Sequence, residues 1–301
     1  MSPQDQQVRR TAFEWIADQV ALHGGVLPRQ LLAEGFTFQG VRVPLLGPQG
    51  IFKPKLCDLP LSITTTPESP YEDAPLGNGL LAYKYRGDQR DTGHRDNVGL
   101  RRAMETQTPL VYFIGLVPGQ YEALWPVYIV GADPASLTFS VAVDDVTSIS
   151  KDGPVLRPDG LEARREYITV LAKRRLHQAK FRALVIDAYR QRCALCRLRH
   201  VNLLDAAHII EDSHAEGVAH VRNGISLCKL HHAAFDAEMV GISPDYEVRV
   251  RGDILEESDG PMLKHGLQGM HGIQLFMPRR KELWPDREKL EVRFERFRGA
   301  A

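Results

Sequence analysis

The residues best suited to chemistry lie in the segment 192–238, where cysteines and histidines recur at ordered spacings. Cys193 and Cys196 are separated by two residues, and so are Cys228 and His231, with 31 residues between the two pairs. Two such pairs are typical of a structural zinc site, because three thiolates and one imidazole saturate a tetrahedral ion. We therefore expect these four residues to hold one zinc ion that has no open position for catalysis.

The segment around these pairs predicts two short strands and a helix. Residues 203–210 are rich in apolar side chains and end in a polar turn, and 225–228 follow an Asn-Gly pair, so both read as strands. Residues 230–239 have a helical pattern. A strand–strand–helix unit of this size buries too little apolar surface to be stable alone, and zinc is expected to staple its two ends.

A second set of polar residues is placed on this predicted unit. His232 and Asp236 stand four residues apart on the helix, so they share a face. One imidazole and one carboxylate on a single face suit a divalent cation of the kind that assists phosphodiester hydrolysis. His208, on the first strand, is the candidate base that deprotonates water.

This arrangement resembles the HNH, or ββα-metal, nuclease family over the segment 192–238. The resemblance implies that His208 is the general base and that Asn223 orients its imidazole across the hairpin. It also implies that His232 is a ligand of a catalytic Mg²⁺ or Mn²⁺. Asp236 falls where some members carry a second ligand on the helix.

One position departs from the family pattern. Many members have Asp or His directly before the general base as a metal ligand, and here that position is Ala207. Asp205 lies two residues earlier on the same strand face and is the candidate substitute. The departure leaves the ligand set of the catalytic metal open.

The same cysteines and histidines allow interpretations without zinc binding or catalysis. The three cysteines and His231 can be scattered core residues, and His208 can be a core histidine with satisfied hydrogen bonds. A zinc-stapled module can also bind DNA or protein without cutting anything. His208 and Asn223 lie between the two Cys/His pairs and His232 follows directly after them, and this order favours the nuclease interpretation over each of these.

Length and composition set the outer limits. A chain of 301 residues with 43% hydrophobic and 25% charged residues is an ordinary globular sequence of about two domains. The longest apolar stretch, 109–132, is interrupted by Pro118, Pro126 and Glu122, so no membrane span is expected. The first ten residues lack the apolar core of a signal peptide, and we expect a cytoplasmic protein in which Cys57 is a free buried thiol.

The formal net charge of zero hides an uneven distribution. The segment 164–199 contains eleven Lys and Arg against two acidic residues, which makes it +9 and the rest of the chain −9. A basic stretch that leads into the predicted nuclease unit suits a phosphate backbone. The alternative is a solvated face of a helix.

The N-terminal half has a different pattern. Residues 11–23 predict an amphipathic helix and 36–43 a hairpin, which together form either a winged-helix-like element or packing for the next domain. From 51 to 145 short apolar strands alternate with Gly, Pro and Asp turns, interrupted by one helix at 97–106. This part has the character of a recognition domain.

Four motifs in this region resemble, in order, the SRA (YDG) domain: Tyr71-Glu72-Asp73, the strand 81–87, the Asn-led helix 96–103 and the strand 109–113. The resemblance implies a PUA-like β-barrel that extrudes a modified cytosine from double-stranded DNA. Tyr71 and Tyr85 then stack on the base and Asp73 accepts its amino hydrogen. The spacing from Tyr71 to Tyr85 is longer than the family's, and a second glycine is missing after Gly87. The alternative is that these tyrosines pack the barrel.

Together these patterns predict an α+β protein of two domains. An SRA-like barrel spans 1–150, with the helical element at 1–50. A linker spans 151–163, and a zinc-stapled HNH nuclease domain spans 164–301. The expected function is cleavage of DNA that carries 5-methyl- or 5-hydroxymethylcytosine, to restrict foreign DNA, with two chains acting together on the two strands. The rival functions are a non-catalytic reader of modified DNA and a repair nuclease that ignores cytosine modification.

Overall fold

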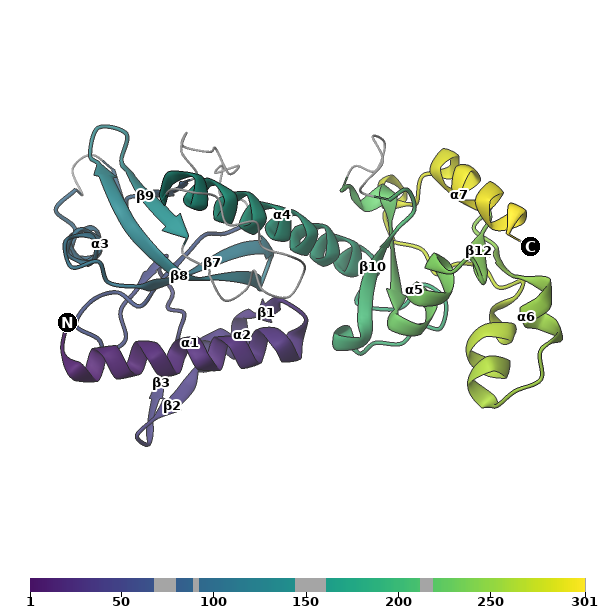
Figure 1. The fold of residues 1–301 in the computed structure, drawn as a ribbon, viewed down its shortest axis with the longest axis horizontal. Helices are drawn as coiled ribbons and strands as arrows, with labels where there is room; N and C mark the ends of the chain where they lie inside the picture. The colour runs from purple at the N-terminus through teal and green to yellow at the C-terminus, as the bar shows by residue number, and fades with distance from the viewer. Residues whose placement is uncertain (68–79, 89–91, 144–160, 212–218, 301) are drawn as a thin grey trace. The chain divides into compact units, whose positions relative to one another are not determined.

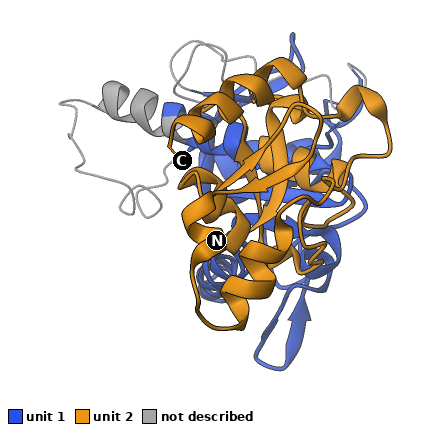
Figure 2. Ribbon diagram, turned by 90° about the vertical axis from the view of Figure 1, so that its right-hand side faces the viewer, with its two compact units in different colours: residues 1–179 blue, residues 180–301 orange. Residues whose placement is uncertain are grey.

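The computed structural model describes residues 1–67, 80–88, 92–143, 161–211 and 219–300 (Figure 1). The chain divides into two compact units, Met1–Ala179 and Lys180–Ala301 (Figure 2). Tyr71, Asp73 and residues 151–160 of the predicted linker 151–163 lie outside the described residues, and residues 161–163 belong to a helix, Leu161–Ala188. None of the helices in the described ranges is long and apolar enough to cross a membrane.

Unit 1 begins with a long helix, α1 (Pro3–His23). The side chain of Ser2 caps its first turn by accepting from the amide of Asp5, and Gly24 ends it in a left-handed conformation with φ 66°. Val8, Ala12 and Ile16 recur at helical spacing and are fully buried. The helix therefore begins eight residues earlier than the apolar pattern from residue 11 predicts.

The strands of unit 1 form one curled mixed sheet with the order β4-β5-β7-β8-β9-β6, to which β1 adds by pairing with β8 (Figure 1). They are β1 (Val26–Pro28), β4 (Ile51–Phe52), β5 (Ser62–Thr64), β6 (Leu81–Lys84), β7 (Leu110–Val117), β8 (Gln120–Asp133) and β9 (Thr138–Val143). Pairing is antiparallel except between β5 and β7, which are parallel. The two longest strands, β7 and β8, are nearly buried along their pairing and form the centre of the sheet.

The N-terminal element shares its core with this sheet. Residues of α1, of α2 (Arg29–Glu34) and of the hairpin β2–β3 (Phe36–Phe38, Val41–Val43) pack in one cluster with Val111 and Phe113 of β7. Of the two alternatives for residues 1–50, the structure thus favours packing for the sheet domain over a separate winged-helix element.

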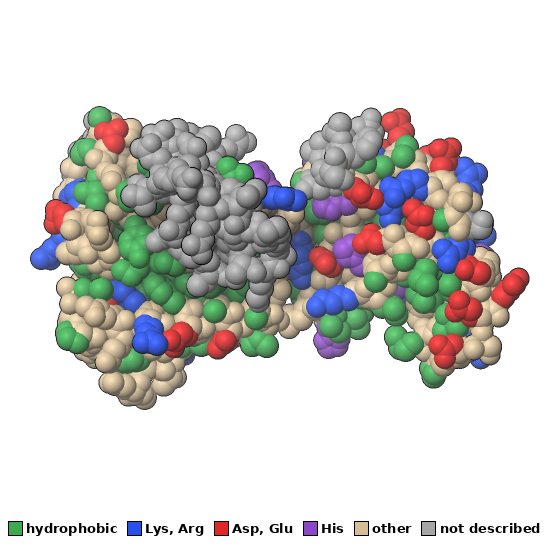
Figure 3. Space-filling view, viewed as in Figure 1, with side chains coloured by type: hydrophobic (Ala, Val, Ile, Leu, Met, Phe, Trp, Pro, Cys, Tyr) green, Lys and Arg blue, Asp and Glu red, His purple; other side chains and the backbone are tan. Residues whose placement is uncertain are grey.

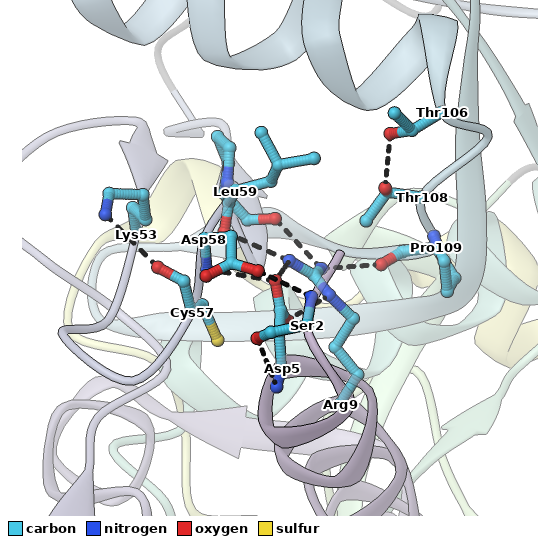
Figure 4. A network of polar contacts seen from close by, with 11 residues as sticks. Ser2, Asp5, Arg9, Lys53, Cys57, Asp58, Leu59, Thr106, Thr108 and Pro109 are labelled. Atoms are coloured by element: carbon cyan, nitrogen blue, oxygen red, sulfur yellow. Dashed lines mark hydrogen bonds and ion pairs between the residues drawn. The ribbon is translucent and has the colours of Figure 1, made fainter.

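A buried ion pair ties α1 to the loops beside the sheet (Figure 4). Arg9 Nε lies 2.7 Å from Asp5 Oδ1, and the two side chains are 2% and 0% exposed. The remaining guanidinium hydrogens of Arg9 go to the carbonyls of Leu59, Pro60 and Pro109. The guanidinium thus supplies donors to three backbone carbonyls in the segments that precede β5 and β7.

Two helices complete unit 1 and lead out of it. α3 (Arg95–Glu105) buries Asn97, Leu100 and Ala103, as the helix predicted at 97–106 requires. α4 (Leu161–Ala188) matches the long helix predicted from 164, and the division between the units falls within it. In unit 1 the Arg175 guanidinium of α4 lies 2.8 Å from the carboxylate of Glu122, a buried residue of β8.

Unit 2 is built on two short hairpins with helices around them. Its elements are η3 (Val201–Leu203), β10 (Leu204–His208), η4 (Val221–Asn223), β11 (Gly224–Cys228), α5 (Lys229–Asp236), β12 (Val240–Ile242), β13 (Val248–Val250), α6 (Gly252–Glu256), η5 (Met262–Leu267), η6 (Gln268–Met270), η7 (Lys281–Leu283) and α7 (Arg287–Gly299). β10 pairs with β11 and β12 with β13, both antiparallel. The hydrophobic core includes the last turns of α4, both hairpins, α5 and α7. The strand–strand–helix unit that the sequence predicts is therefore β10–β11–α5.

Candidate functional site

Cys193, Cys196, Cys228 and His231 come together in unit 2. One ligand atom from each lies within 4.8 Å of all the others. Nδ1 of His231 is 3.4 Å from Sγ of Cys193 and 3.2 Å from Sγ of Cys228. These separations are close to those between the ligands of a tetrahedral zinc ion, whose bonds measure about 2.3 Å to sulfur and about 2.0 Å to nitrogen. The donor set fits zinc, and this is the prediction that the structure supports most directly.

The His231 ring is fixed from its far side. Its Nε2 lies 2.6 Å from the carbonyl oxygen of Gly266. A carbonyl in this place accepts the Nε2 proton, which leaves Nδ1 with its lone pair facing the thiols. Hydrogen bonds from the Cys193 and Cys196 thiols lower the pKa of Cys228, so one sulfur of the cluster readily becomes a thiolate.

The β10–β11 hairpin carries His208 at the end where residues 209–223 connect the two strands, and there His208 pairs with Gly224. Asn223 closes that end. Its side-chain nitrogen donates to the carbonyl of Ile210 over 2.9 Å, and its side-chain oxygen accepts from the Ile210 amide over 3.0 Å. Its own carbonyl accepts from the amide of Ile209 over 2.9 Å. Asn223 therefore fixes the backbone directly after His208, while its predicted effect on the imidazole itself stays a prediction.

The His208 ring is placed by stacking. It lies on Phe181 of α4 with ring centroids 4.1 Å apart and planes 16° from parallel. The opposite residue, Gly224, has no room for a side chain, since an added Cβ would lie 2.7 Å from Cζ of Phe181 and 2.4 Å from Cγ2 of Val185. The glycine thus lets α4 approach the hairpin closely enough for Phe181 to support His208.

His232, Asp205 and Asp236 form a second polar cluster. Nδ1 of His232 lies 3.5 Å from Oδ2 of Asp205 on β10, and Nε2 lies 3.2 Å from Oδ2 of Asp236 on α5. The three side chains are 24%, 43% and 58% exposed. Figure 3 shows histidine and carboxylate side chains adjacent to one another on the surface of unit 2. The structure thus brings together the three residues predicted to hold the catalytic metal.

The two carboxylates contact opposite nitrogens of the ring. An ion bound to Nε2 therefore lies on the side of Asp236, and an ion bound to Nδ1 lies on the side of Asp205. Asp205 is the more fully engaged of the two. Its Oδ1 accepts from the amide of Ala206 over 2.9 Å and lies 3.5 Å from Nε of Arg182. Since magnesium usually keeps several waters and takes few protein ligands, one imidazole and one carboxylate are a sufficient donor set.

The cluster is electrostatically prepared for a cation. Asp205 accepts a hydrogen bond from the His232 ring and, with the charge of Asp236, raises the pKa of His232 although burial opposes this. Burial alone would raise the pKa of Asp205, but the hydrogen bonds from His232 and the Ala206 amide hold it below its ordinary value. Both carboxylates thus favour positive charge at the ring, which a divalent ion supplies in place of a proton.

Comparison with protein families adds a specific finding. Residues 193–243 match the family model described as HNH endonuclease. The matched residues contain the Cys-Cys-Cys-His set, the β10–β11 hairpin and the His232 cluster. We call residues 193–243 the HNH segment.

The other comparisons are weaker. No curated protein matches the chain. Among solved structures, a modification-dependent restriction endonuclease, TagI, is similar with 15% identity and a TM-score of 0.32, over 79% of this chain and 81% of the other. The Type IV phosphorothioation-dependent restriction endonuclease ScoMcrA is similar with 16% identity and a TM-score of 0.20, over 69% of this chain and 53% of the other.

Three supporting residues around the HNH segment are not evident from the sequence. Phe181 stacks on His208, Arg182 lies beside Asp205, and Arg293 of α7 lies 3.6 Å from Asp236. Arg293 is 4% exposed and donates to the carbonyl of Phe235 near the end of α5. All three residues lie outside the segment that the motif covers, and only their apolar or charged character was available as a signal.

In unit 1 the described part of the predicted base pocket is Tyr85. Its ring is 5% exposed and stacks on Phe139 of β9 with centroids 4.1 Å apart. Arg101 of α3 approaches the same ring to 5.9 Å. This environment is that of a core residue of the curled sheet, and the stacking of Tyr85 on an extruded base stays a prediction.

Proposed function

We propose that this protein is a metal-dependent endonuclease that cuts double-stranded DNA carrying a modified cytosine, and that it restricts foreign DNA. The observation that carries the nuclease part is the match of residues 193–243 to the HNH endonuclease model, together with the side chains gathered on that segment. The zinc-ligand set and the His232 cluster are separate, so one metal holds the fold and the other assists the reaction.

The catalytic ion, Mg²⁺ or Mn²⁺, is held in this proposal by Nε2 of His232 and by Asp236. Asp205 accepts the Nδ1 proton and so keeps the lone pair on Nε2, as carboxylates beside metal-bound histidines commonly do. Asp205 thus acts as a positioning residue, and Ala207 does not need a substitute ligand on β10. An ion held by these residues would supply positive charge for the negative charge that develops at the phosphate and on the leaving oxygen.

His208 is the general base in this proposal. A neutral imidazole accepts a proton from water as the water attacks phosphorus, and the ring must be held still to do so. Stacking on Phe181 and the backbone contacts of Asn223 with Ile209 and Ile210 supply that restraint. Asn223 therefore supports the base through the chain, whether or not it also contacts the ring.

Dependence on modified cytosine rests on the resemblance of the N-terminal motifs to the SRA domain. The helix α3 and the strands β6 and β7 lie where those motifs predict secondary structure. Tyr71 and Asp73, the stacking residue and the acceptor in this proposal, belong to the motif before β6. Because one HNH segment cuts one strand at a time, a double-strand break further implies two chains acting together.

A non-catalytic reader of modified DNA is the rival function, and Ala207 favours it, since many HNH enzymes have a metal ligand there. Purified protein should be incubated with Mg²⁺ or Mn²⁺ and matched duplexes that contain cytosine, 5-methylcytosine or 5-hydroxymethylcytosine. Cleavage of a modified duplex alone is the expected result. Equal cleavage of all three leaves a nuclease without modification dependence, and binding without any cleavage establishes the reader.

A further inference from the structure

Three arginines surround one aromatic ring beside the zinc-ligand set. The guanidinium carbons of Arg190, Arg197 and Arg192 lie 4.2, 5.5 and 5.8 Å from the centroid of the Phe276 ring. A ring face attracts cations, but three cations at one ring also repel one another. We call Arg190, Arg192 and Arg197, with Phe276, the arginine cluster.

The cluster lacks acidic partners. Within the described ranges, none of its three arginines forms an ion pair with Asp or Glu. Other arginines of unit 2 do, such as Arg249 with Glu247 at 2.9 Å and Arg280 with Glu282 at 3.0 Å. Unit 2 as a whole is nearly neutral, with 19 Lys and Arg against 18 Asp and Glu in residues 180–301. The excess positive charge is therefore confined to the arginine cluster, where it favours binding of an external anion.

The turn at residues 193–197, which carries the candidate zinc ligands Cys193 and Cys196, holds the cluster in place. We call it the zinc-binding turn. Arg192 precedes Cys193, and the amide of Arg197 donates to the Cys193 carbonyl over 3.0 Å. The amide of Phe276 donates to the carbonyl of Ala194, in the same turn, over 2.8 Å. The ring and two of its arginines are thus attached to one short stretch of backbone that the metal ligands define.

Two of the arginines occupy backbone conformations that suit other residues better. Arg190 has φ 57° and Arg197 has φ 63°, both in the left-handed region where glycine carries no penalty. Neither long side chain helps the local backbone. Their presence at these positions is explained if the guanidinium groups have a use of their own.

We propose that the arginine cluster binds the phosphate backbone of duplex DNA. Guanidinium groups present paired donors that match phosphate oxygens, and neighbouring phosphates supply the several negative charges that three unpaired arginines require. The inference deepens the proposed function, because it assumes that DNA is the substrate and names the surface that holds it. It also gives the zinc-binding turn a second role, as the scaffold of the DNA contact.

The test measures binding without cleavage. Full-length protein carrying His208→Ala is titrated with a fluorescent unmodified duplex at salt concentrations between about 50 and 200 mM, with no Mg²⁺ or Mn²⁺ added. The variant Arg190→Gly/Arg197→Gly is compared with its parent. The slope of log K against log salt is negative, and each lost phosphate contact reduces its magnitude by about 0.9. In the variant the magnitude of the slope should therefore be smaller by nearly 2. Glycine at both positions relieves the left-handed backbone, so the melting temperature should not fall.

The matched control is Arg249→Ala/Arg280→Ala, which removes the same charge from arginines that already have acidic partners. It should leave the salt slope unchanged. An unchanged slope in the cluster variant, or an equal fall in both variants, overturns the proposal. Failure of the nuclease proposal looks different: the unsubstituted protein cuts no DNA, yet the cluster variant still loses salt-dependent binding.

Discussion

Two polar centres of this molecule use the same kinds of side chain in opposite ways. In unit 1, Asp5 and Arg9 are 0% and 2% exposed, and the amide of Asp58 and three backbone carbonyls take up their remaining capacity. In unit 2, His232 lies between two carboxylates that are 43% and 58% exposed. A saturated, buried ion pair has nothing to exchange and holds structure. A half-exposed one can release a proton and take a metal ion.

The zinc-ligand set should show the largest effect, since it stabilises the unit that contains the second centre. Zinc binding supplies about 10–16 kcal/mol to small zinc modules, so Cys196→Ser should unfold unit 2 and abolish zinc in elemental analysis. Cys57→Ala, which removes the free thiol of unit 1, is the control and should retain both zinc and the unit 2 melting transition. An undisturbed unit 2 transition in Cys196→Ser would rule out a structural zinc.

Removal of His208, the proposed general base, should have the next largest effect. His208→Ala should lower the single-turnover cleavage rate by about 10²–10⁴-fold, because water then loses its proton acceptor. Zinc content and DNA affinity should stay within error of the parent, since His208 belongs to neither function. A variant that cuts at the parental rate removes His208 from the mechanism.

For the buried Asp5–Arg9 pair of unit 1 the comparison predicts a loss of stability instead of a loss of activity. Arg9→Met should cost about 3–5 kcal/mol of unfolding free energy, because Asp5 is left buried without its cation. Its neighbour provides the control: Arg10 pairs with Glu14 at the surface, where the two side chains are 83% and 64% exposed. Arg10→Met should change stability by less than about 1 kcal/mol. Denaturant unfolding measures both, and equal costs would refute the distinction between the two kinds of pair.

The carboxylates beside His232 separate a ligand from a positioning residue. Asp236→Asn removes a metal ligand and should raise the metal concentration needed for half-maximal cleavage more than Asp205→Asn does. Asp205→Asn removes a partner that orients the histidine, and it should lower the cleavage rate by about 10–100-fold. If Asp205→Asn has the larger effect on metal dependence, the ion sits on Nδ1 and the assignment reverses.

The buried carboxyl group of Glu122 in unit 1 should give the smallest of these effects, a pH dependence of stability. Glu122 is buried, and within the described residues its Oε2 has no hydrogen-bond partner. Burial raises its pKa from 4.5 to about 7, against the opposing effect of Arg175. Between pH 4.5 and 7 the folded state therefore holds more protons than the unfolded state. The protonated carboxyl group of Glu122 therefore contributes stability that is fully present below pH 4.5 and is lost as pH rises through about 7.

Glu122→Gln keeps the neutral form at every pH. The difference in unfolding free energy between the parent and Glu122→Gln should shift against the parent by about 1–3 kcal/mol between pH 4.5 and 7. Thermal unfolding in a series of buffers measures the shift. A constant difference across this range would mean that Glu122 stays ionised in the folded protein.

The sequence predicted those parts of the site that depend on local spacing. The gathering of the four candidate zinc ligands, the β10–β11–α5 unit and the meeting of His232 with Asp205 and Asp236 follow from short-range patterns and from the register of one hairpin. The helix and strand positions of the N-terminal half were also predictable, because apolar periodicity is a local signal.

What the sequence did not reveal depends on contacts between distant segments. Nothing near Arg9 indicates that its side chain reaches Pro109, a hundred residues away, and nothing near Phe276 indicates three arginines around it. The early start of α1 escaped prediction because its first turns carry mainly polar residues around Val8. Long-range packing decides such positions, and one sequence carries no direct record of it.

Gly224 has a consequence for how this protein tolerates mutation. Any side chain there collides with Val185 and Phe181, and Phe181 supports the ring of His208. A methyl group at this position is expected to displace the ring of His208, the proposed base, while every residue with reactive chemistry is retained. In a random library screened for loss of DNA cutting, clones altered at 224 should therefore appear beside those altered at the histidines. Their codons would identify a site that no chemical motif marks.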